Sequence, residues 1–243
     1  MERTFKVNFT IRSYHIYPNK KLTLTSLLGF LQEAAGLHAI RLNRGLKDLE
    51  KDNLTWVLSR MFLEVDKWPE LGETVIIETW PKGFDRLFAT RDFFINSIQG
   101  DVLARASSYW LLIDRDTKRP KPMQNITDDL LNPDLSAINH KLQKIAPPEK
   151  TDYYSQKKVE YSDIDLNGHV NNIRYSEWII NTIPADILQT RKIKFFEINY
   201  LSEVKLGESV HIELGDQMDK ENLISGSILH ENNEACRIRL KFK

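Results

Sequence analysis

The sequence predicts an α+β protein of two tandem units, each a long helix wrapped by an antiparallel sheet. A repeat is the main observation, since Leu71-Gly-Glu-Thr-Val-Ile-Ile-Glu78 returns as Leu206-Gly-Glu-Ser-Val-His-Ile-Glu213. Each copy opens a run of alternating apolar and polar residues, which is typical of strands. A segment with helical spacing of apolar residues precedes each copy, beginning near residues 24 and 172.

The first half opens with an alternating segment over residues 1–10 and continues, after a polar turn, with a helix over residues 24–42. Thr25 or Ser26 is available to cap that helix. An insertion at 43–53 separates the helix from the next strand. We expect strands at 56–66, 74–81, 89–97 and 102–113.

The second half repeats this order, with a helix from about Asn172. Between the halves, a stretch containing Pro and Asn from about residue 120 to residue 150 indicates a connector. We place the units at 1–132 and 151–243, with a linker over 133–150. We expect strands at 156–161, 192–201, 209–214, 223–230 and 235–242.

Composition narrows the class of protein. The chain has 243 residues, 41% of them hydrophobic, which is enough for real cores. Lys+Arg and Asp+Glu both total 34, and this balance argues against nucleic acid as a partner. No apolar run is long enough to span a bilayer, and the N-terminus lacks the apolar core of a signal peptide. With one cysteine, Cys236, no internal disulfide can form, and we expect a cytoplasmic protein.

The segment from Asp163 to Tyr175 carries the chemistry. Its sequence, Asp-Ile-Asp-Leu-Asn-Gly-His-Val-Asn-Asn-Ile-Arg-Tyr, crowds acids, amides and an imidazole before an apolar helix. Asp163, Asp165 and Asn167 resemble the opening of a calcium loop, but Arg174 stands at the twelfth position, where that loop needs a bidentate Glu. The six histidines form no pair at zinc-ligand spacing. We therefore expect neither a metal nor another cofactor.

Helix capping explains part of the segment. Asn171 or Asn172 can accept from the first free backbone N–H groups of the helix. One helix end needs only one or two such groups, so capping leaves Asp165, Asn167 and His169 unexplained. His169 can carry a proton near neutral pH, and Asp165 can orient it or a water molecule. Asn167 can donate to a carbonyl, so these residues suit hydrolysis of an activated acyl compound.

The first half has a weaker counterpart of this segment. Tyr17-Pro-Asn-Lys-Lys-Leu22 aligns with Asp165-Leu-Asn-Gly-His-Val170, which puts Tyr17 in place of Asp165 and Lys21 in place of His169. We expect that the first half has lost the chemistry. Cys236 lies in an alternating C-terminal segment and reads as a small core residue, and no Gly-x-Ser-x-Gly elbow is present.

The order Asp-x-Asp-x-Asn-x-His-Val-Asn-Asn-x-x-Tyr closely resembles the signature of the acyl-acyl-carrier-protein thioesterases of plants and bacteria. The resemblance covers nearly the whole chain. Further matching segments are Ile11-Arg-Ser-Tyr14, Leu31-Gln-Glu33, Asn53-Leu-Thr-Trp-Val57, Arg60-Met61 and Arg105-Ala-Ser-Ser108.

This resemblance implies a double hotdog fold and hydrolysis of fatty acyl thioesters on acyl carrier protein. It implies that the first unit holds the acyl chain and the second carries catalysis by Asp165, Asn167 and His169. A further acid of the family falls on Glu203, within Asn199-Tyr-Leu-Ser-Glu-Val204. The cysteine once proposed as that family's nucleophile corresponds to Val204, so a Cys–His acyl-enzyme route is excluded here.

We expect Glu203 or Asp165 to deprotonate a water molecule, with His169 completing the proton relay. Asn167, together with backbone N–H groups near Val170, is expected to stabilise the thioester oxygen. An apolar slot must hold the acyl chain, although every candidate also suits an ordinary core. The candidates are Leu27, Leu31, Ala34, Trp56, Leu58, Met61 and Trp110.

Acyl carrier protein is the expected partner. Two other functions stay open at this point: a hotdog thioesterase acting on acyl-coenzyme A, and a non-catalytic acyl-binding or acyl-sensing hotdog protein. The resemblance also suggests a homodimer, while two units joined in one chain are compatible with a monomer.

Overall fold

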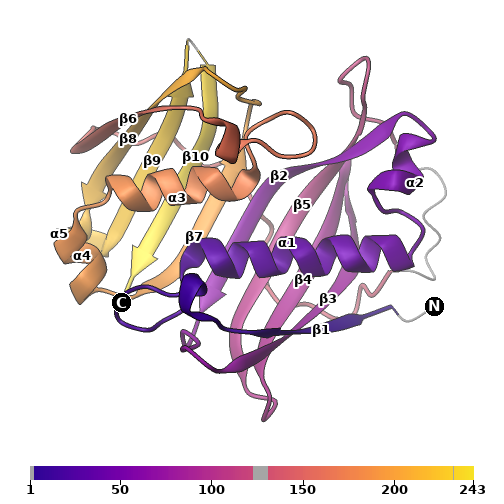
Figure 1. Ribbon diagram of the computed structural model, residues 1–243, viewed down its shortest axis with the longest axis horizontal. Helices are drawn as coiled ribbons and strands as arrows, with labels where there is room; N and C mark the ends of the chain where they lie inside the picture. Colours follow the sequence, from indigo (N-terminus) through magenta and orange to yellow (C-terminus); the bar gives the residue numbers. More distant parts are fainter. Residues whose placement is uncertain (1–2, 123–130, 232) are drawn as a thin grey trace. The chain divides into compact units, whose positions relative to one another are not determined.

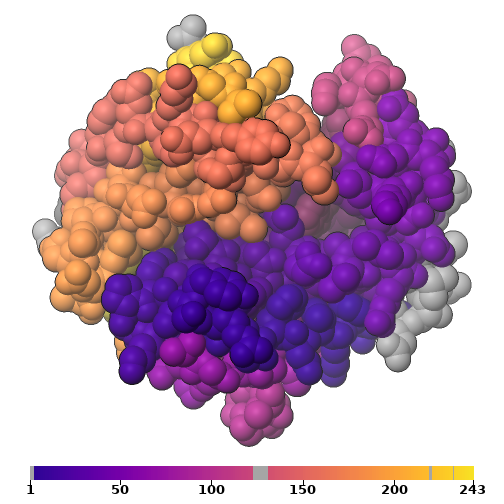
Figure 2. All heavy atoms as spheres, viewed as in Figure 1, coloured from indigo at the N-terminus to yellow at the C-terminus, as the bar shows by residue number. Residues whose placement is uncertain are grey.

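The computed structural model describes residues 3–122, 131–231 and 233–243. The chain divides into two compact units, Met1–Leu142 and Gln143–Lys243 (Figure 1). Figure 2 shows the atoms of the chain in the same view.

The first unit places one long helix on an antiparallel sheet. The sheet order is β1-β3-β4-β5-β2, and α1 lies across one face of it (Figure 1). Leu24, Leu27 and Leu31 of α1 are fully buried, each contributing roughly 2 kcal/mol of hydrophobic stabilisation. The elements are β1 (Phe5–Thr10), a 3₁₀ turn (Ser13–His15), α1 (Leu24–Arg41), α2 (Leu46–Glu50), β2 (Leu54–Val65), β3 (Thr74–Asp85), β4 (Phe88–Ser97) and β5 (Val102–Asp114).

The second unit has the same plan. Its sheet order is β6-β8-β9-β10-β7, again antiparallel, and α3 packs against β6 and β8. The elements are β6 (Tyr153–Lys158), a 3₁₀ turn (Tyr161–Asp163), α3 (Asn172–Thr182), α4 (Ala185–Thr190), β7 (Ile193–Tyr200), β8 (Ser209–Gln217), α5 (Met218–Glu221), β9 (Leu223–His230) and β10 (Asn233–Phe242).

Both units share one topology. Counted along the chain, the strands of each sheet lie in the order first, third, fourth, fifth, second. The predicted α+β architecture with a duplicated helix-on-sheet unit is therefore confirmed.

Two local expectations differ from the structure. Thr23, not Thr25 or Ser26, caps α1, and its Oγ1 accepts from Ser26 N at 3.0 Å. β6 covers Tyr153–Lys158 rather than residues 156–161. The Asp163 carboxylate accepts from Glu160 N at 2.9 Å, which turns the chain into a 3₁₀ helix instead of a longer strand. The insertion at 43–53 contains the short helix α2.

The stretch expected as a linker, 133–150, is hydrogen-bonded to each sheet in turn. In the first unit, Ala137 N donates to Asp92 Oδ2 at 2.9 Å, and Trp80 Nε1 donates to Leu135 O at 3.0 Å. In the second unit, Ile145 N donates to Asn199 Oδ1 at 2.8 Å. These bonds satisfy backbone groups that would otherwise be buried without partners.

Candidate active site

A tight turn before α3 holds three of the four predicted catalytic residues. Asp165 N donates to His169 O at 2.8 Å, and Gly168 N donates to Asp165 O at 3.1 Å. Gly168 has φ +80°, a conformation that favours glycine. Asp165 Oδ1 accepts from Asn167 N at 2.8 Å, so one carboxylate oxygen of Asp165 shapes the turn itself.

His169 meets Glu203 across the sheet edge. His169 Nε2 lies 3.1 Å from Glu203 Oε2, and these side chains are 19% and 45% exposed. The structure thus brings together two of the predicted residues that are far apart in the sequence. Asp165 lies in the same turn as His169, whereas Asn167 is exposed at its tip.

Backbone contacts between residues 169–170 and 204–205 place His169 beside Glu203. Val170 N donates to Val204 O at 2.9 Å, and His169 forms an isolated antiparallel bridge with Lys205. Because Glu203 directly precedes this paired segment, its side chain emerges beside His169. The Val170 amide is therefore engaged, and it does not offer the free N–H group that we expected at this position.

A buried tyrosine of α3 lies next to the acidic groups. Tyr175 is 3% exposed, and burial raises the pKa of its hydroxyl, with Cys236, Glu203 and Asp165 adding to the rise. A hydrogen bond with the Val204 backbone acts in the opposite direction. The hydroxyl therefore stays protonated at any physiological pH.

Cys236 is unsuited to nucleophilic chemistry. The side chain is fully buried on β10, and burial raises the pKa of its thiol above the usual range. This agrees with the sequence interpretation of Cys236 as a core residue.

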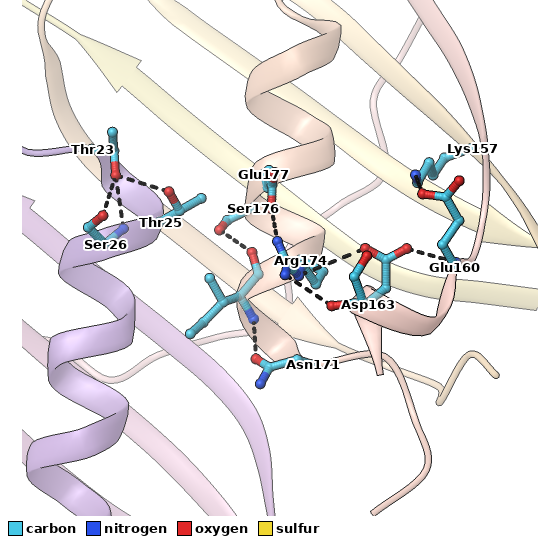
Figure 3. A network of polar contacts seen from close by, with 12 residues as sticks. Thr23, Thr25, Ser26, Lys157, Glu160, Asp163, Asn171, Arg174, Ser176 and Glu177 are labelled. Atoms are coloured by element: carbon cyan, nitrogen blue, oxygen red, sulfur yellow. Dashed lines mark hydrogen bonds and ion pairs between the residues drawn. The ribbon is translucent and has the colours of Figure 1, made fainter. Parts of the chain in front are cut away.

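The helix start beside the turn is held by its own polar contacts. Asn171 caps α3, its Oδ1 accepting from Ile173 N at 3.0 Å, as predicted (Figure 3). Asn172 is instead the first helical residue, and its carbonyl accepts from Tyr200 Oη at 3.0 Å. Asp163 is 5% exposed and lies between Glu160 and Arg174 (Figure 3), so its carboxylate supports the turn rather than facing outward.

The first unit contains the same turn with different side chains. Tyr17 N donates to Lys21 O at 2.9 Å, and Lys20 N donates to Tyr17 O at 2.9 Å, as Asp165, His169 and Gly168 do in the second unit. Lys20 also takes the positive φ of Gly168, at 65°. The weak sequence match between these segments therefore reflects one backbone structure. Lys21 Nζ lies 2.9 Å from Glu70 Oε1, and this ion pair joins the two residues that correspond to His169 and Lys205 of the second unit.

The predicted acyl-lining residues lie on α1 and on the helix-facing side of the first sheet. Leu58 pairs with Trp110, and Met61 pairs with Ser108, which puts each pair on one face. Trp56 Nε1 donates to Arg44 O at 3.1 Å, so Trp56 also faces the helical layer. Leu27, Leu31, Ala34, Leu58 and Met61 are buried, whereas Trp56 and Trp110 retain some exposure.

Sequence reasoning missed Arg91 on this face. Arg91 pairs with Ser108 across the sheet, and its Nη1 lies 3.1 Å from His38 Nδ1 of α1 and 3.2 Å from Thr79 Oγ1. Burial lowers the pKa of Arg91 to about 10. Within the described part of the chain, no carboxylate forms an ion pair with it. A cation in an alternating strand gives no sequence signal of burial.

The described residues include neither a candidate metal site nor a membrane-spanning helix. No group of three or more His, Cys, Asp and Glu side chains in those residues could hold a metal ion. No helix among them is long and apolar enough to cross a membrane.

The duplicated helix-on-sheet plan, with a polar turn at the start of the second helix, defines a double hotdog protein. Residues 2–133 match the acyl-ACP thioesterase N-terminal domain, and residues 147–243 match the C-terminal domain of the same family. The chain belongs to the acyl-ACP thioesterase family.

Solved structures agree with this assignment. An acyl-ACP thioesterase from Bacteroides thetaiotaomicron is 29% identical, with a TM-score of 0.90 over 99% of this chain and 98% of that one. The 12:0-ACP thioesterase from Umbellularia californica is 25% identical, with a TM-score of 0.87 over 99% and 94% of the two chains.

Curated plant relatives are longer than this chain. Oleoyl-acyl carrier protein thioesterase 1 of Arabidopsis thaliana, a chloroplastic protein, is 30% identical over 228 residues, which are 85% of this chain and 62% of that protein. The chain thus spans about three fifths of the length of that relative.

Proposed function

We propose that this chain hydrolyses the thioester of a fatty acyl group on acyl carrier protein, releasing the free fatty acid and the carrier thiol and so ending chain elongation. The observation that carries the proposal is the contact of 3.1 Å between His169 Nε2 and Glu203 Oε2 beside the turn of Asp165 and Asn167. Family membership supports the substrate class.

In the proposed reaction, the Glu203 carboxylate takes a proton from a water molecule as the water oxygen attacks the thioester carbonyl carbon. Negative charge collects on the carbonyl oxygen of the tetrahedral intermediate. The proton passes from Glu203 to His169 across their contact of 3.1 Å, and His169 gives it to the departing sulfur as the carbon–sulfur bond breaks. Water is the only co-reactant, so the step needs no metal or other cofactor.

Asn167 is the proposed donor to the carbonyl oxygen. Val170 N and Asn171 N are both engaged already, since they donate to Val204 O and Asp163 O. The side-chain amide of Asn167 is exposed at the tip of the turn, where an incoming thioester can reach it. Asp165 is proposed to hold this tip in place, because its Oδ1 accepts from Asn167 N.

The first unit is proposed to hold the acyl chain between α1 and the sheet. Its candidate lining is apolar on both layers, from Leu27, Leu31 and Ala34 of the helix to Leu58 and Met61 of β2. The proposed division of labour between units matches their side chains, since in the first unit Lys21 stands in place of His169 and Trp68 in place of Glu203.

Glu203→Gln tests the proposed chemistry. We expect kcat on acyl carrier protein thioesters to fall by a factor of 10² to 10⁴, the usual range for general acid–base catalysis, with an unchanged melting temperature. Glu70→Gln is the control, because it removes a carboxylate that contacts Lys21, the residue at the His169 position of the first unit, and it should leave kcat within twofold. Near-normal turnover by Glu203→Gln would rule out the proposed role.

The same assay separates the alternatives. Faster release of thiol from acyl-coenzyme A than from acyl carrier protein would favour a coenzyme A thioesterase. Acyl binding without thiol release at any chain length would favour a sensor. A cytoplasmic location and a homodimer stay predictions.

A further inference from the structure

Glu208, directly before β8, closes the turn that follows Glu203. Its Oε2 accepts from Lys205 N at 2.7 Å, and its own amide donates to Lys205 O at 3.3 Å. Its carbonyl accepts from Val159 N at 2.8 Å, which ties the turn to the chain after β6. The carboxylate therefore restrains Lys205 from within the same short turn.

The His230 imidazole lies against the Glu208 carboxylate. His230 ends β9 opposite Val210, and its Nε2 lies 2.9 Å from Glu208 Oε2. The two side chains are 10% and 29% exposed, so solvent screens this contact less than it screens most surface pairs. His230 therefore limits the directions in which the Glu208 carboxylate can point.

Lys205 is the link to the site. Its backbone forms the bridge with His169, and Val204 O accepts from Val170 N at 2.9 Å. On the other side, Leu201 N donates to Ala235 O at 2.9 Å. Glu203 thus lies between two backbone anchors, and Glu208 supplies the contact that fixes the later one.

Comparison with the first unit separates the contacts that both units share from those found in the second unit. There Glu73 Oε2 accepts from Glu70 N at 2.8 Å, the same contact as that of Glu208 with Lys205 N. Ser97 stands opposite Val75, where the second unit has His230 opposite Val210. The carboxylate contact is common to both units, and the imidazole occurs in the unit that carries His169 and Glu203.

We propose that Glu208 and His230 are positioning residues that keep Glu203 and His169 at their working distance. Neither needs to touch the substrate, because both act through the backbone of Lys205. The inference rests on the proposed role of Glu203. It adds a chain of contacts from β9 to the site: His230, Glu208, Lys205 N and then the bridge to His169.

Glu208→Ala and Glu73→Ala are a matched pair, since each removes the same contact from one unit. Both should lower the melting temperature by similar amounts. With dodecanoyl- and palmitoyl-acyl carrier protein as substrates, Glu208→Ala should lower kcat about tenfold or more at nearly constant KM, because small misplacements of catalytic groups are costly. Glu73→Ala should leave kcat within twofold. Equal effects of both variants on kcat would overturn the proposal.

His230 is tested by rescue. His230→Leu removes the imidazole contact with Glu208 and should lower kcat. His230→Gln keeps a polar group beside the carboxylate and should recover most of the loss. If His230→Leu retains normal kcat while remaining folded, the imidazole has no positioning role.

A double variant separates this inference from the proposed function. If Glu208 acts through Glu203, Glu203→Gln with Glu208→Ala should be no slower than Glu203→Gln alone. Additive losses would overturn the positioning role only. Near-normal turnover by Glu203→Gln alone would overturn the role of Glu203, whatever the Glu208 variant shows.

Discussion

At the scale of single residues, side chains that the sequence groups together have different environments. Asp165 uses one carboxylate oxygen within its own turn, and Asp163 is nearly buried against Arg174 and Glu160. Glu203 is half-exposed and lies against His169. One oxygen of Asp165 is thus occupied within its turn, whereas Glu203 is open to water and contacts His169. This comparison favours Glu203 over Asp165 as the proposed base.

Cys236 allows a prediction at the same scale. Because burial raises the pKa of its thiol, the folded protein should react with a thiol reagent at pH 8 far more slowly than the unfolded protein. Cys236→Ala should keep kcat within about twofold, with a modest loss of stability. Labelling before and after denaturation, with one thiol per chain, checks the first part. A large fall in kcat on Cys236→Ala at normal stability would contradict the second.

At the scale of elements, the two polar turns share a backbone but not a sequence. Gly168 and Lys20 hold the same position with φ of 80° and 65°. Glycine adopts this conformation without cost, whereas a residue with a Cβ is strained there by about 1 kcal/mol. Lys20 can occupy this position in the first unit because, in the proposed function, no thioester has to approach that turn.

This difference predicts opposite effects of two substitutions. Lys20→Gly should raise the free energy of unfolding by up to about 1 kcal/mol, less the entropy that glycine adds to the unfolded chain. Gly168→Ala should lower it by about 1 kcal/mol and also lower kcat, because the turn carries Asn167 and His169. Denaturant unfolding measures both. If Lys20→Gly lowered the free energy of unfolding and Gly168→Ala left it unchanged, positive φ would not be the source of strain at these two positions.

At the scale of the whole molecule, duplication gave two units with one topology and different side chains. The proposed catalytic contacts all lie in Gln143–Lys243, and the proposed acyl-lining residues lie in Met1–Leu142. Substitutions in the two units should therefore change different properties: turnover of all substrates in the second unit, and preference among acyl chains in the first.

Arg91 tests that division. Its guanidinium lies on the helix-facing side of the first sheet. Arg91 pairs with Ser108, which pairs with Met61 on the next strand, so the three residues share one face. Arg91→Met should extend the apolar lining and favour longer acyl chains, by roughly fourfold in kcat/KM for each added methylene that is buried. The measurement is kcat/KM across acyl carrier protein thioesters of increasing length.

Arg60→Met is the control for Arg91→Met. Arg60 donates to Leu142 O at 2.6 Å and lies over the Phe88 ring, on the opposite face of the same sheet. Its replacement should leave the preference for chain length unchanged. Equal shifts by both variants, or a uniform fall at every length for Arg91→Met, would argue against an acyl-facing Arg91.

Much of the fold could be predicted because its signals are local. Alternation predicted the strands, helical spacing placed α1 and the start of α3 within a residue or two, and Asn171 was one of two candidates for the α3 cap. The errors occurred where a side chain ended an element. Asp163 accepts from Glu160 N and stops β6 early, and Thr23 caps α1 from one residue before the predicted helix. Such contacts depend on rotamers that spacing does not encode.

The sequence by itself determined the duplicated α+β plan, the polar turn before α3 and the family. These follow from periodicity, turn residues and a motif, all of which act over short stretches of chain. Tertiary structure decided that Glu203 meets His169, that Val170 N is already engaged, and that the Arg91 side chain contacts His38 of α1. Each of these depends on strand register between distant segments, and a shift of one residue would turn every side chain concerned to the other face.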